Sequence, residues 1–215
     1  MNISEQQLIL YAVTDRKWLQ DGQTLAGQVE QAILGGVTVV QLREKHASAA
    51  EFLAIAQEVK QVTDRYQVPL IINDNLEVAL AVDAAGIHVG QEDLAAAAVR
   101  QKIGDKKIVG VSAQTVEQAL AAEQAGADYL GVGAVFPTSS KDDAVEVDFA
   151  TLQAICQAVQ IPVVAIGGIT VQNMTALQGS GIVGVAVISA IFGKPDVKKA
   201  AQDLTAAWNS LPENR

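Results

Sequence analysis

The sequence predicts an α/β fold, a single (β/α)8 TIM barrel that takes in residues 1–215, and three observations support this prediction. Short β-branched apolar runs alternate with longer Ala-rich segments of helical period, eight of each. Eight parallel strands, each followed by a crossover helix, close into a barrel, whereas an open sheet rarely needs eight strands of such even spacing. No Pro-rich, Gly-rich or charged stretch divides the 215 residues, of which 50% are hydrophobic, so one domain with a sizeable core is expected.

The expected elements follow one another in a regular order along the chain. Gly and Ala-Gly steps at 35–36, 85–86 and 125–127 end three of the helices, because Gly supplies the left-handed cap before the next strand. Strands are expected at 8–13, 37–42, 70–73, 87–89, 108–111, 129–132, 163–166 and 183–187. Helices are expected at 24–35, 49–65, 76–85, 94–103, 115–125, 148–159, 170–178 and 195–210.

Composition and charge exclude several classes of protein. The formal net charge of −9 argues against long contacts with nucleic acid or with an anionic membrane surface. The chain starts without the cationic and apolar regions of a signal peptide, and the apolar stretch at 182–192 is well short of the ~20 residues that span a bilayer. We therefore expect a cytoplasmic protein with no nucleic-acid or membrane partner. A homo-oligomer stays open, because apolar side chains on the outer helices could serve a dimer.

A cationic segment follows the second expected strand, and active sites of such barrels lie at the carboxyl ends of the strands. Arg43 and Lys45 alternate with other residues there, as expected if both point to a common ligand. Together with Lys141, after the sixth strand, they supply three cations that could hold a diphosphate. Taken singly, each of them could be a solvated surface charge.

Two aspartates follow neighbouring strands. Asp74 comes after the third strand and Asp93 after the fourth, so each could contribute one carboxylate to a common ion. Mg²⁺ in proteins takes one or two carboxylates together with substrate phosphate oxygens and waters. Either aspartate could instead cap the helix that follows it.

The last two strands are followed by small residues that could bind a phosphate group. Gly167 and Gly168 come after the seventh strand, and Ser189 comes after the eighth. Loops in these positions commonly bind phosphate through backbone N–H groups. The Gly pair alone is explained equally well by a tight turn.

The only histidines are His46 and His88. His88 lies within an expected strand, so a hydrogen-bonded structural role is favoured over a role as a base, and His46 is expected at the surface. The sequence contains no metal-binding His/Cys spacing, no catalytic Ser-His-Asp set and no nucleotide-binding fingerprint.

Taken together, these segments resemble the thiamine phosphate synthases, in the order of that family and from about residue 10 to residue 195. Ser140 stands where the family commonly has Thr, which keeps the hydroxyl group. The segments that carry the resemblance are Tyr11-Ala12-Val13-Thr14-Asp15, Gln41-Leu42-Arg43-Glu44-Lys45, Asn73-Asp74, His88-Val89-Gly90-Gln91-Glu92-Asp93, Gly110-Val111-Ser112, Pro137-Thr138-Ser139-Ser140-Lys141, Gly167-Gly168-Ile169 and Ile188-Ser189.

The resemblance implies a role for each of these positions. A pyrimidine, 4-amino-2-methyl-5-(diphosphooxymethyl)pyrimidine, would be bound by Gln41, Leu42, Arg43, Glu44, Lys45, Asn73, Ser112 and Lys141. Of these, Arg43, Lys45, Ser112 and Lys141 would be catalytic, and Asp74 and Asp93 would hold Mg²⁺. A thiazole phosphate, carboxylated or not, would be bound by Thr138, Ser139, Ser140, Gly168, Ile188 and Ser189.

The implied activity is that of a transferase in thiamine biosynthesis, which forms thiamine phosphate and releases diphosphate. One alternative is a thiazole tautomerase of the same superfamily, a branch that uses a His in the loop after the fifth strand. Here that loop reads Ser112-Ala113-Gln114 and has no His, which favours the synthase. The other alternative is a non-catalytic sensor that binds thiamine phosphate, and an assay of diphosphate release separates it from an enzyme.

Overall fold

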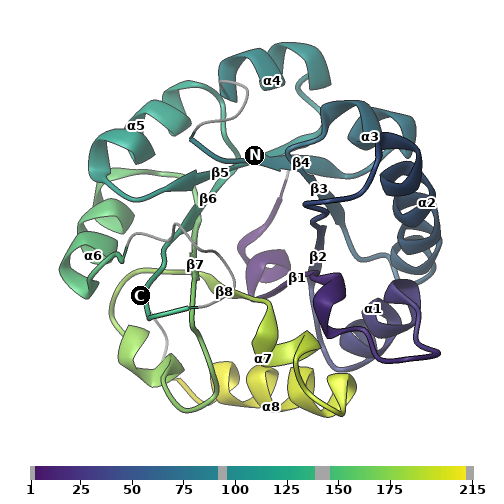
Figure 1. Cartoon of the computed structure of the whole chain (residues 1–215). Helices are drawn as coiled ribbons and strands as arrows, with labels where there is room; N and C mark the ends of the chain where they lie inside the picture. The colour runs from purple at the N-terminus through teal and green to yellow at the C-terminus, as the bar shows by residue number, and fades with distance from the viewer. Residues whose placement is uncertain (1–2, 92–95, 139–145, 212–215) are drawn as a thin grey trace.

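The computed structural model describes residues 3–91, 96–138 and 146–211. Its strands form a closed parallel barrel in the order β1 to β8, and helices cover the outside of the barrel (Figure 1). The predicted TIM barrel is therefore confirmed. Tyr11 of β1 lies opposite Ala186 of β8, and this pairing closes the barrel. The strands are β1 (Leu10–Val13), β2 (Val39–Leu42), β3 (Leu70–Asn73), β4 (Gly86–Val89), β5 (Ile108–Ala113), β6 (Tyr129–Val132), β7 (Val163–Ile166) and β8 (Gly184–Val187).

Most of the helices begin at a side chain that caps them. Thr24, Ser48 and Asn75 each accept a hydrogen bond from the backbone N–H three residues later, which satisfies one of the free donors at a helix start. These caps explain why the expected starts of these three helices, at 24, 49 and 76, lie within one residue of the observed starts. The α-helices are α1 (Leu25–Leu34), α2 (Ala49–Arg65), α3 (Leu76–Ala81), α4 (Ala96–Ile103), α5 (Val116–Gln124), α6 (Phe149–Ala158), α7 (Ser189–Phe192) and α8 (Val197–Asn209), and the 3-10 turns are η1 (Glu5–Leu8), η2 (Arg16–Trp18) and η3 (Met174–Leu177).

The prediction of a helix at 170–178 is wrong, because this segment contains only η3. Asn173 accepts a hydrogen bond from the N–H of Thr170 at 2.7 Å, and the Thr170 hydroxyl accepts one from the N–H of Asn173 at 3.3 Å. Gly179 and Gly181 then take positive φ angles of 80° and 93°, which helical backbone does not allow. The side-chain turn and the two glycines leave room for a single turn of 3-10 helix.

Two separate apolar cores hold the barrel together. The larger one lies between the strands and the surrounding helices, and the smaller one fills the barrel interior around Tyr11, Ile71 and Tyr129. Ile3 and Leu8, from the segment before β1, belong to the inner core and close the amino end of the barrel. No helix in the described part of the chain is long and apolar enough to cross a membrane.

Candidate functional site

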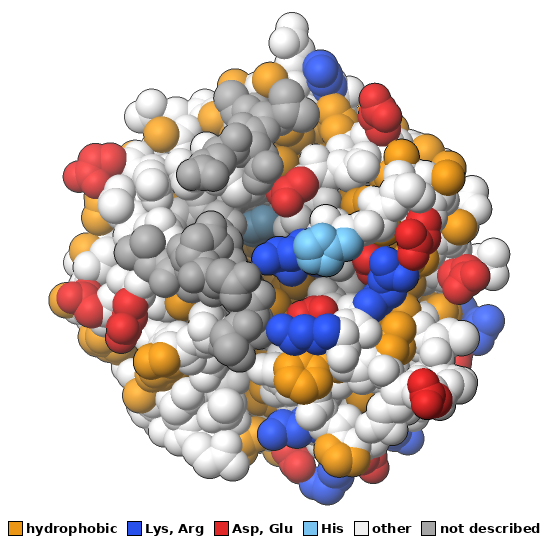
Figure 2. Space-filling view, in the orientation of Figure 1, with side chains coloured by type: hydrophobic (Ala, Val, Ile, Leu, Met, Phe, Trp, Pro, Cys, Tyr) orange, Lys and Arg blue, Asp and Glu red, His pale blue; other side chains and the backbone are white. Residues whose placement is uncertain are grey.

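Polar side chains gather at the carboxyl ends of the strands. The inner face of β2 continues from Val39 to Gln41, and the same alternation places Asn73, His88 and Ser112 toward the barrel axis. Lys and Arg side chains lie near the centre of this face of the molecule (Figure 2). The structure thus brings Gln41, Asn73 and Ser112 to one opening, whereas the side chain of Leu42, also predicted to bind the pyrimidine, is buried in the larger core outside the strands.

A continuous chain of hydrogen bonds crosses the barrel interior below this opening. Gln41 Nε2 donates to the Tyr11 hydroxyl at 2.9 Å, and the Tyr11 and Tyr129 hydroxyls lie 2.6 Å apart. The Tyr129 hydroxyl lies 2.9 Å from His88 Nδ1, and His88 Nε2 lies 3.0 Å from Ser112 Oγ. Two predicted substrate-binding residues, Gln41 and Ser112, are therefore joined through three buried side chains.

The side chains of Tyr11 and Tyr129, both part of this hydrogen-bond chain, stay protonated and neutral. Burial raises the pKa of Tyr11 and of Tyr129 well above the ordinary value, because the phenolate would lose its hydration inside the barrel. Each phenol therefore keeps a proton that it must place on a neighbouring acceptor.

Two glycines make room for these rings. A Cβ atom on Gly110 would lie 2.1 Å from the ring of Tyr129, and one on Gly131 would lie 3.2 Å from the ring of His88. The hydrogen-bond chain thus depends on small residues at two inward positions of β5 and β6. The resemblance had included Gly110 without giving it this role.

The charged residues in the segment after β2 differ in whether they have a partner within the described part of the protein. Glu44 pairs with Arg16 at 2.8 Å, and Arg16 also pairs with Glu51 of α2 at 2.7 Å. Burial raises the pKa of the Glu44 carboxyl, while the charge of Arg16 opposes this rise. Among the described residues, neither Arg43 nor Lys45 has a carboxylate partner, so these two cations are free to meet a ligand.

Asp74 lies beside the end of β4 and does not cap the next helix. Its N–H donates to the carbonyl of His88 at 2.9 Å, and its carboxylate accepts a hydrogen bond from Asn73 Nδ2. The cap of α3 is Asn75, whose side chain accepts from the N–H of Val78 at 2.9 Å. The alternative explanation of Asp74 as a helix cap is therefore wrong. The second predicted metal ligand, Asp93, lies outside the described residues.

The loops after β6 and β7 are packed against each other. Gly167 and Gly168 have φ angles of 104° and 64°, and a Cβ atom on Gly168 would lie 2.4 Å from the carbonyl oxygen of Pro137. Glycine is thus required here by backbone conformation and by space. Thr138 directly follows this contact, and Ile188 and Ser189 lie after β8 at the same end of the barrel. Ser139, Ser140 and Lys141 lie outside the described residues.

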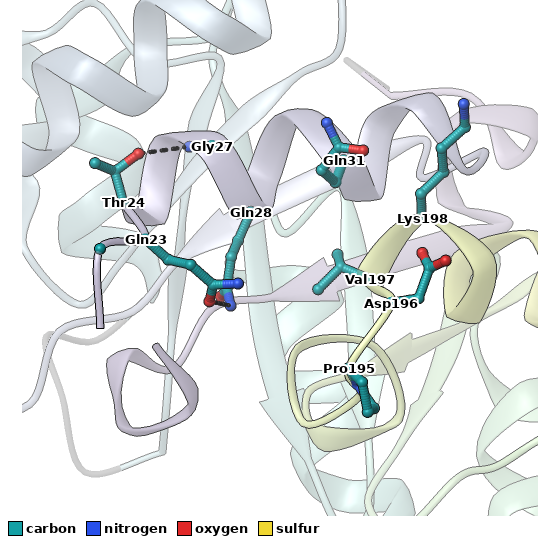
Figure 3. Close-up of a pocket in the computed structure, with 10 residues that line it drawn as sticks. Gln23, Thr24, Gly27, Gln28, Gln31, Pro195, Asp196, Val197 and Lys198 are labelled. Carbon is teal, nitrogen blue, oxygen red and sulfur yellow. Dashed lines mark hydrogen bonds between the residues drawn. The ribbon is translucent and has the colours of Figure 1, made fainter. Parts of the chain in front are cut away.

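A cavity of about 520 Å³ lies outside the barrel, between the starts of α1 and α8 (Figure 3). Thr24 and Asp196 cap these two helices by accepting hydrogen bonds from Gly27 and Lys199 at 3.0 and 2.8 Å. Both helix starts are therefore already satisfied by the protein. None of the described residues that line the cavity is a predicted site residue.

Sequence reasoning missed Tyr129 and gave no role to Tyr11. A signal for both exists, since each tyrosine occupies an inward position of its strand in the period-two pattern. Their contact with each other depends on how the strands are staggered around the barrel, which a single sequence does not specify.

The chain is similar to known proteins over most of its length. The family model described as "Thiamine monophosphate synthase" matches residues 10–191. A curated "Thiamine-phosphate synthase" of Clostridium tetani is 56% identical over 200 residues, 93% of this chain and 95% of the relative. A curated "Thiamine-phosphate synthase" of Ruminiclostridium cellulolyticum is 55% identical, and the match covers 91% of this chain and 92% of the relative.

A solved structure agrees with these relatives. "Thiamine phosphate pyrophosphorylase" from Pyrococcus furiosus is 39% identical, covers 95% of this chain and 97% of its own, and superimposes with a TM-score of 0.87. Neither the tautomerase nor the sensor is favoured by these names. The family model over residues 10–191, together with relatives and a solved structure that match more than nine-tenths of the chain, shows that this protein belongs to the thiamine monophosphate synthase family.

Proposed function

We propose that the chain is a thiamine-phosphate synthase. It joins 4-amino-2-methyl-5-(diphosphooxymethyl)pyrimidine to a thiazole phosphate, or its carboxylated form, and releases diphosphate. The observation that carries the proposal is the pair of cations after β2, Arg43 and Lys45, which have no carboxylate partner among the described residues of a chain with net charge −9. Cations left free in an acidic protein mark a site for an anionic ligand.

The reaction needs no protein nucleophile. The bond between the exocyclic CH₂ carbon of the pyrimidine and the diphosphate oxygen breaks, and the electron pair leaves with diphosphate. The electron-rich aminopyrimidine ring carries the positive charge until the thiazole nitrogen attacks the CH₂ carbon and forms the new C–N bond. Arg43 and Lys45 stabilise the negative charge that gathers on the leaving group, as preorganised donors do in other enzymes. Lys141, outside the described residues, is proposed to act with them.

The residues present fit a magnesium ion that is completed by the substrate. Asp74 is exposed, lies beside the strand ends and is not used as a helix cap. The described residues contain no cluster of three or more acidic, His or Cys side chains that could hold a metal alone. Mg²⁺ commonly takes one or two carboxylates and the oxygens of a substrate phosphate, so Asp74 and Asp93 would hold it with the diphosphate. When bound, the ion would neutralise charge on the leaving group.

The thiazole phosphate is proposed to lie at the opposite side of the opening. Gly168 and Ser189 follow β7 and β8, and Thr138 lies next to the contact between Pro137 and Gly168. Ile188 and the undescribed Ser139 and Ser140 complete the proposed set. This arrangement separates the phosphate group from Arg43 and Lys45, so the two substrates would be bound by different loops.

Both proposed substrates are small molecules, and the proposal includes no nucleic-acid or membrane partner. From the sequence we further propose one catalytic domain over residues 1–215 and a cytoplasmic location.

The proposal is tested by measuring release of diphosphate from the pyrimidine substrate, with and without the thiazole phosphate, in buffer containing Mg²⁺. A synthase releases diphosphate and forms thiamine phosphate in equal amounts when both substrates are present. Binding of both substrates without diphosphate release would identify a sensor, and isomerisation of the thiazole alone would identify a tautomerase. Either result would overturn the proposal.

A further inference from the structure

The protons of the buried hydrogen-bond chain can be placed one by one. The Tyr11 oxygen accepts from Gln41 Nε2, so its own proton must go to another acceptor. Among the described side chains that acceptor is the hydroxyl oxygen of Tyr129, 2.6 Å away. Tyr129 therefore cannot donate to Tyr11 and must donate to His88 Nδ1 at 2.9 Å. A buried hydroxyl with no acceptor would cost about 1–3 kcal/mol, which disfavours the other arrangements.

The direction of these hydrogen bonds determines which ring nitrogen of His88 carries the proton. His88 accepts at Nδ1, so its single proton lies on Nε2, and Nε2 donates to Ser112 Oγ at 3.0 Å. The Ser112 hydroxyl already accepts from His88, so its own proton points away from the chain. In this form His88 cannot remove a proton from Ser112, which excludes a role as a base toward that hydroxyl.

The other end of the hydrogen-bond chain is Gln41, which donates a hydrogen bond into it. Gln41 is 5% exposed, and its Nε2 is held by Tyr11. No side chain or backbone donor among the described residues bonds to its Oε1, and this oxygen is not one of the fully buried unpartnered atoms. An amide oxygen that no described donor occupies can accept a hydrogen bond from a ligand. The hydrogen-bond chain thus ends in an acceptor, the amide oxygen of Gln41, and in a donor, the hydroxyl of Ser112.

We propose that Tyr11, Tyr129 and His88 are positioning residues that orient Gln41 to accept a hydrogen bond from the pyrimidine substrate and Ser112 to donate one to it. This inference rests on the proposed function. The chemistry of the ligand agrees with it, because the aminopyrimidine carries an N–H donor and the diphosphate oxygens only accept. The three positioning residues act through Gln41 and Ser112 and are not catalytic residues.

The first test measures the tautomer of His88 by ¹⁵N NMR of the histidine rings and needs no substrate. The variant His46→Gln assigns the signals, since the chain has two histidines. The proposal expects the proton on Nε2 in the protein and in Tyr11→Phe, which keeps the contact between Tyr129 and His88. Tyr129→Phe removes that contact and is expected to give a mixture of tautomers. A proton on Nδ1 in the unaltered protein would overturn the proposal.

The second test compares the two Michaelis constants. Tyr129→Phe and Tyr11→Phe are each expected to raise the KM for the pyrimidine diphosphate roughly tenfold, the ratio that corresponds to one lost hydrogen bond. The KM for the thiazole phosphate is expected to stay unchanged. The matched control is Tyr66→Phe, which removes a hydroxyl that bonds to Glu30 at 2.9 Å. It should change neither KM.

The outcomes separate this inference from the proposed function. Equal increases in both Michaelis constants, or a similar change in Tyr66→Phe, would show a purely structural role and overturn the positioning role. If the unaltered protein releases no diphosphate, the proposed function fails, while the NMR experiment still decides the direction of the hydrogen-bond chain.

Discussion

Arginine occurs at both ends of the barrel, but its surroundings differ completely between them. At the amino end, Arg100 of α4 donates to the carbonyl oxygens of Gly104, Lys107 and Gly126 at 2.7–3.0 Å and pairs with Asp128 at 2.5 Å. At the carboxyl end, the described residues offer Arg43 no carboxylate at all. The Arg100 side chain is bonded to several protein groups, whereas the Arg43 side chain has no ion-pair partner among the described residues.

This difference indicates that the amino end of the barrel contributes to stability and that the carboxyl end is available for function. The partners of Arg100 belong to the segments that lead into β5 and β6, so this arginine fastens two strand starts. Barrels of this type use the amino end for stability and the carboxyl end for chemistry. An arginine without an ion-pair partner among the described residues gains little in the folded state, which agrees with the ligand-binding role proposed for Arg43.

The largest effect is expected from Arg100→Met. Removing one member of a buried ion pair leaves the Asp128 carboxylate without its countercharge, and this typically costs about 3–5 kcal/mol. For a domain of this size that loss lowers the melting temperature by about 6–20 °C. Calorimetry measures the change, and both Michaelis constants should stay as they were. In the double variant Arg100→Met with Asp128→Asn, part of the stability should return, because the buried charge that lost its countercharge is gone. A melting temperature that does not move would mean that the amino end does not depend on this pair.

The next effect in size is expected from Arg43→Gln. Loss of one preorganised donor to the leaving group typically lowers turnover by roughly 10²–10³. The melting temperature should not fall, because no carboxylate in the described part of the protein pairs with this side chain. Initial rates of diphosphate release and a thermal scan on the same sample provide the two readouts. Turnover within a few-fold of the unaltered protein, or a large drop in melting temperature, would contradict the comparison of the two ends.

The smallest effect is expected within one loop, between neighbouring residues. Asn75→Ala removes the cap of α3 and should cost about 1 kcal/mol of stability without changing the metal requirement. Asp74→Asn should leave stability unchanged, since Asn tolerates the positive φ of 61° at this position. It should raise the Mg²⁺ concentration needed for half of full activity. Metal titrations and denaturant unfolding of both variants check this, and an unaltered metal requirement in Asp74→Asn would remove this aspartate from the magnesium site.

The regular part of the fold follows closely from local patterns. The strands at 70–73, 129–132 and 163–166 and the helix at 49–65 agree with the structure at both ends. The β-branched runs and the cap at Ser48 carry this information within a few residues of each boundary. The helix expected at 170–178 failed because the Thr170 and Asn173 side chains compete with the backbone for hydrogen bonds.

The site was predictable only in part, for a geometric reason. Residues after neighbouring strands can be grouped from their order alone, as with Arg43 and Asp74. Contacts across the barrel, such as Tyr11 with Tyr129, depend on the stagger of all the strands together. The proton direction that this contact imposes on His88 and Ser112 was therefore hidden, although every residue involved was visible in the sequence.

The contact that closes the amino end of the barrel joins residues that are far apart in the sequence, which matters during synthesis of the protein. Leu8 enters the inner core, and its carbonyl oxygen lies so near Gly184 that a Cβ atom there would come within 1.9 Å. The ribosome therefore delivers Leu8 long before it delivers Gly184. Until β8 emerges, β1 lacks one of its two neighbours, and the apolar side chains Tyr11 and Val13 lack part of their cover. During synthesis, β1 therefore keeps one open edge until all the other strands of the barrel have been made.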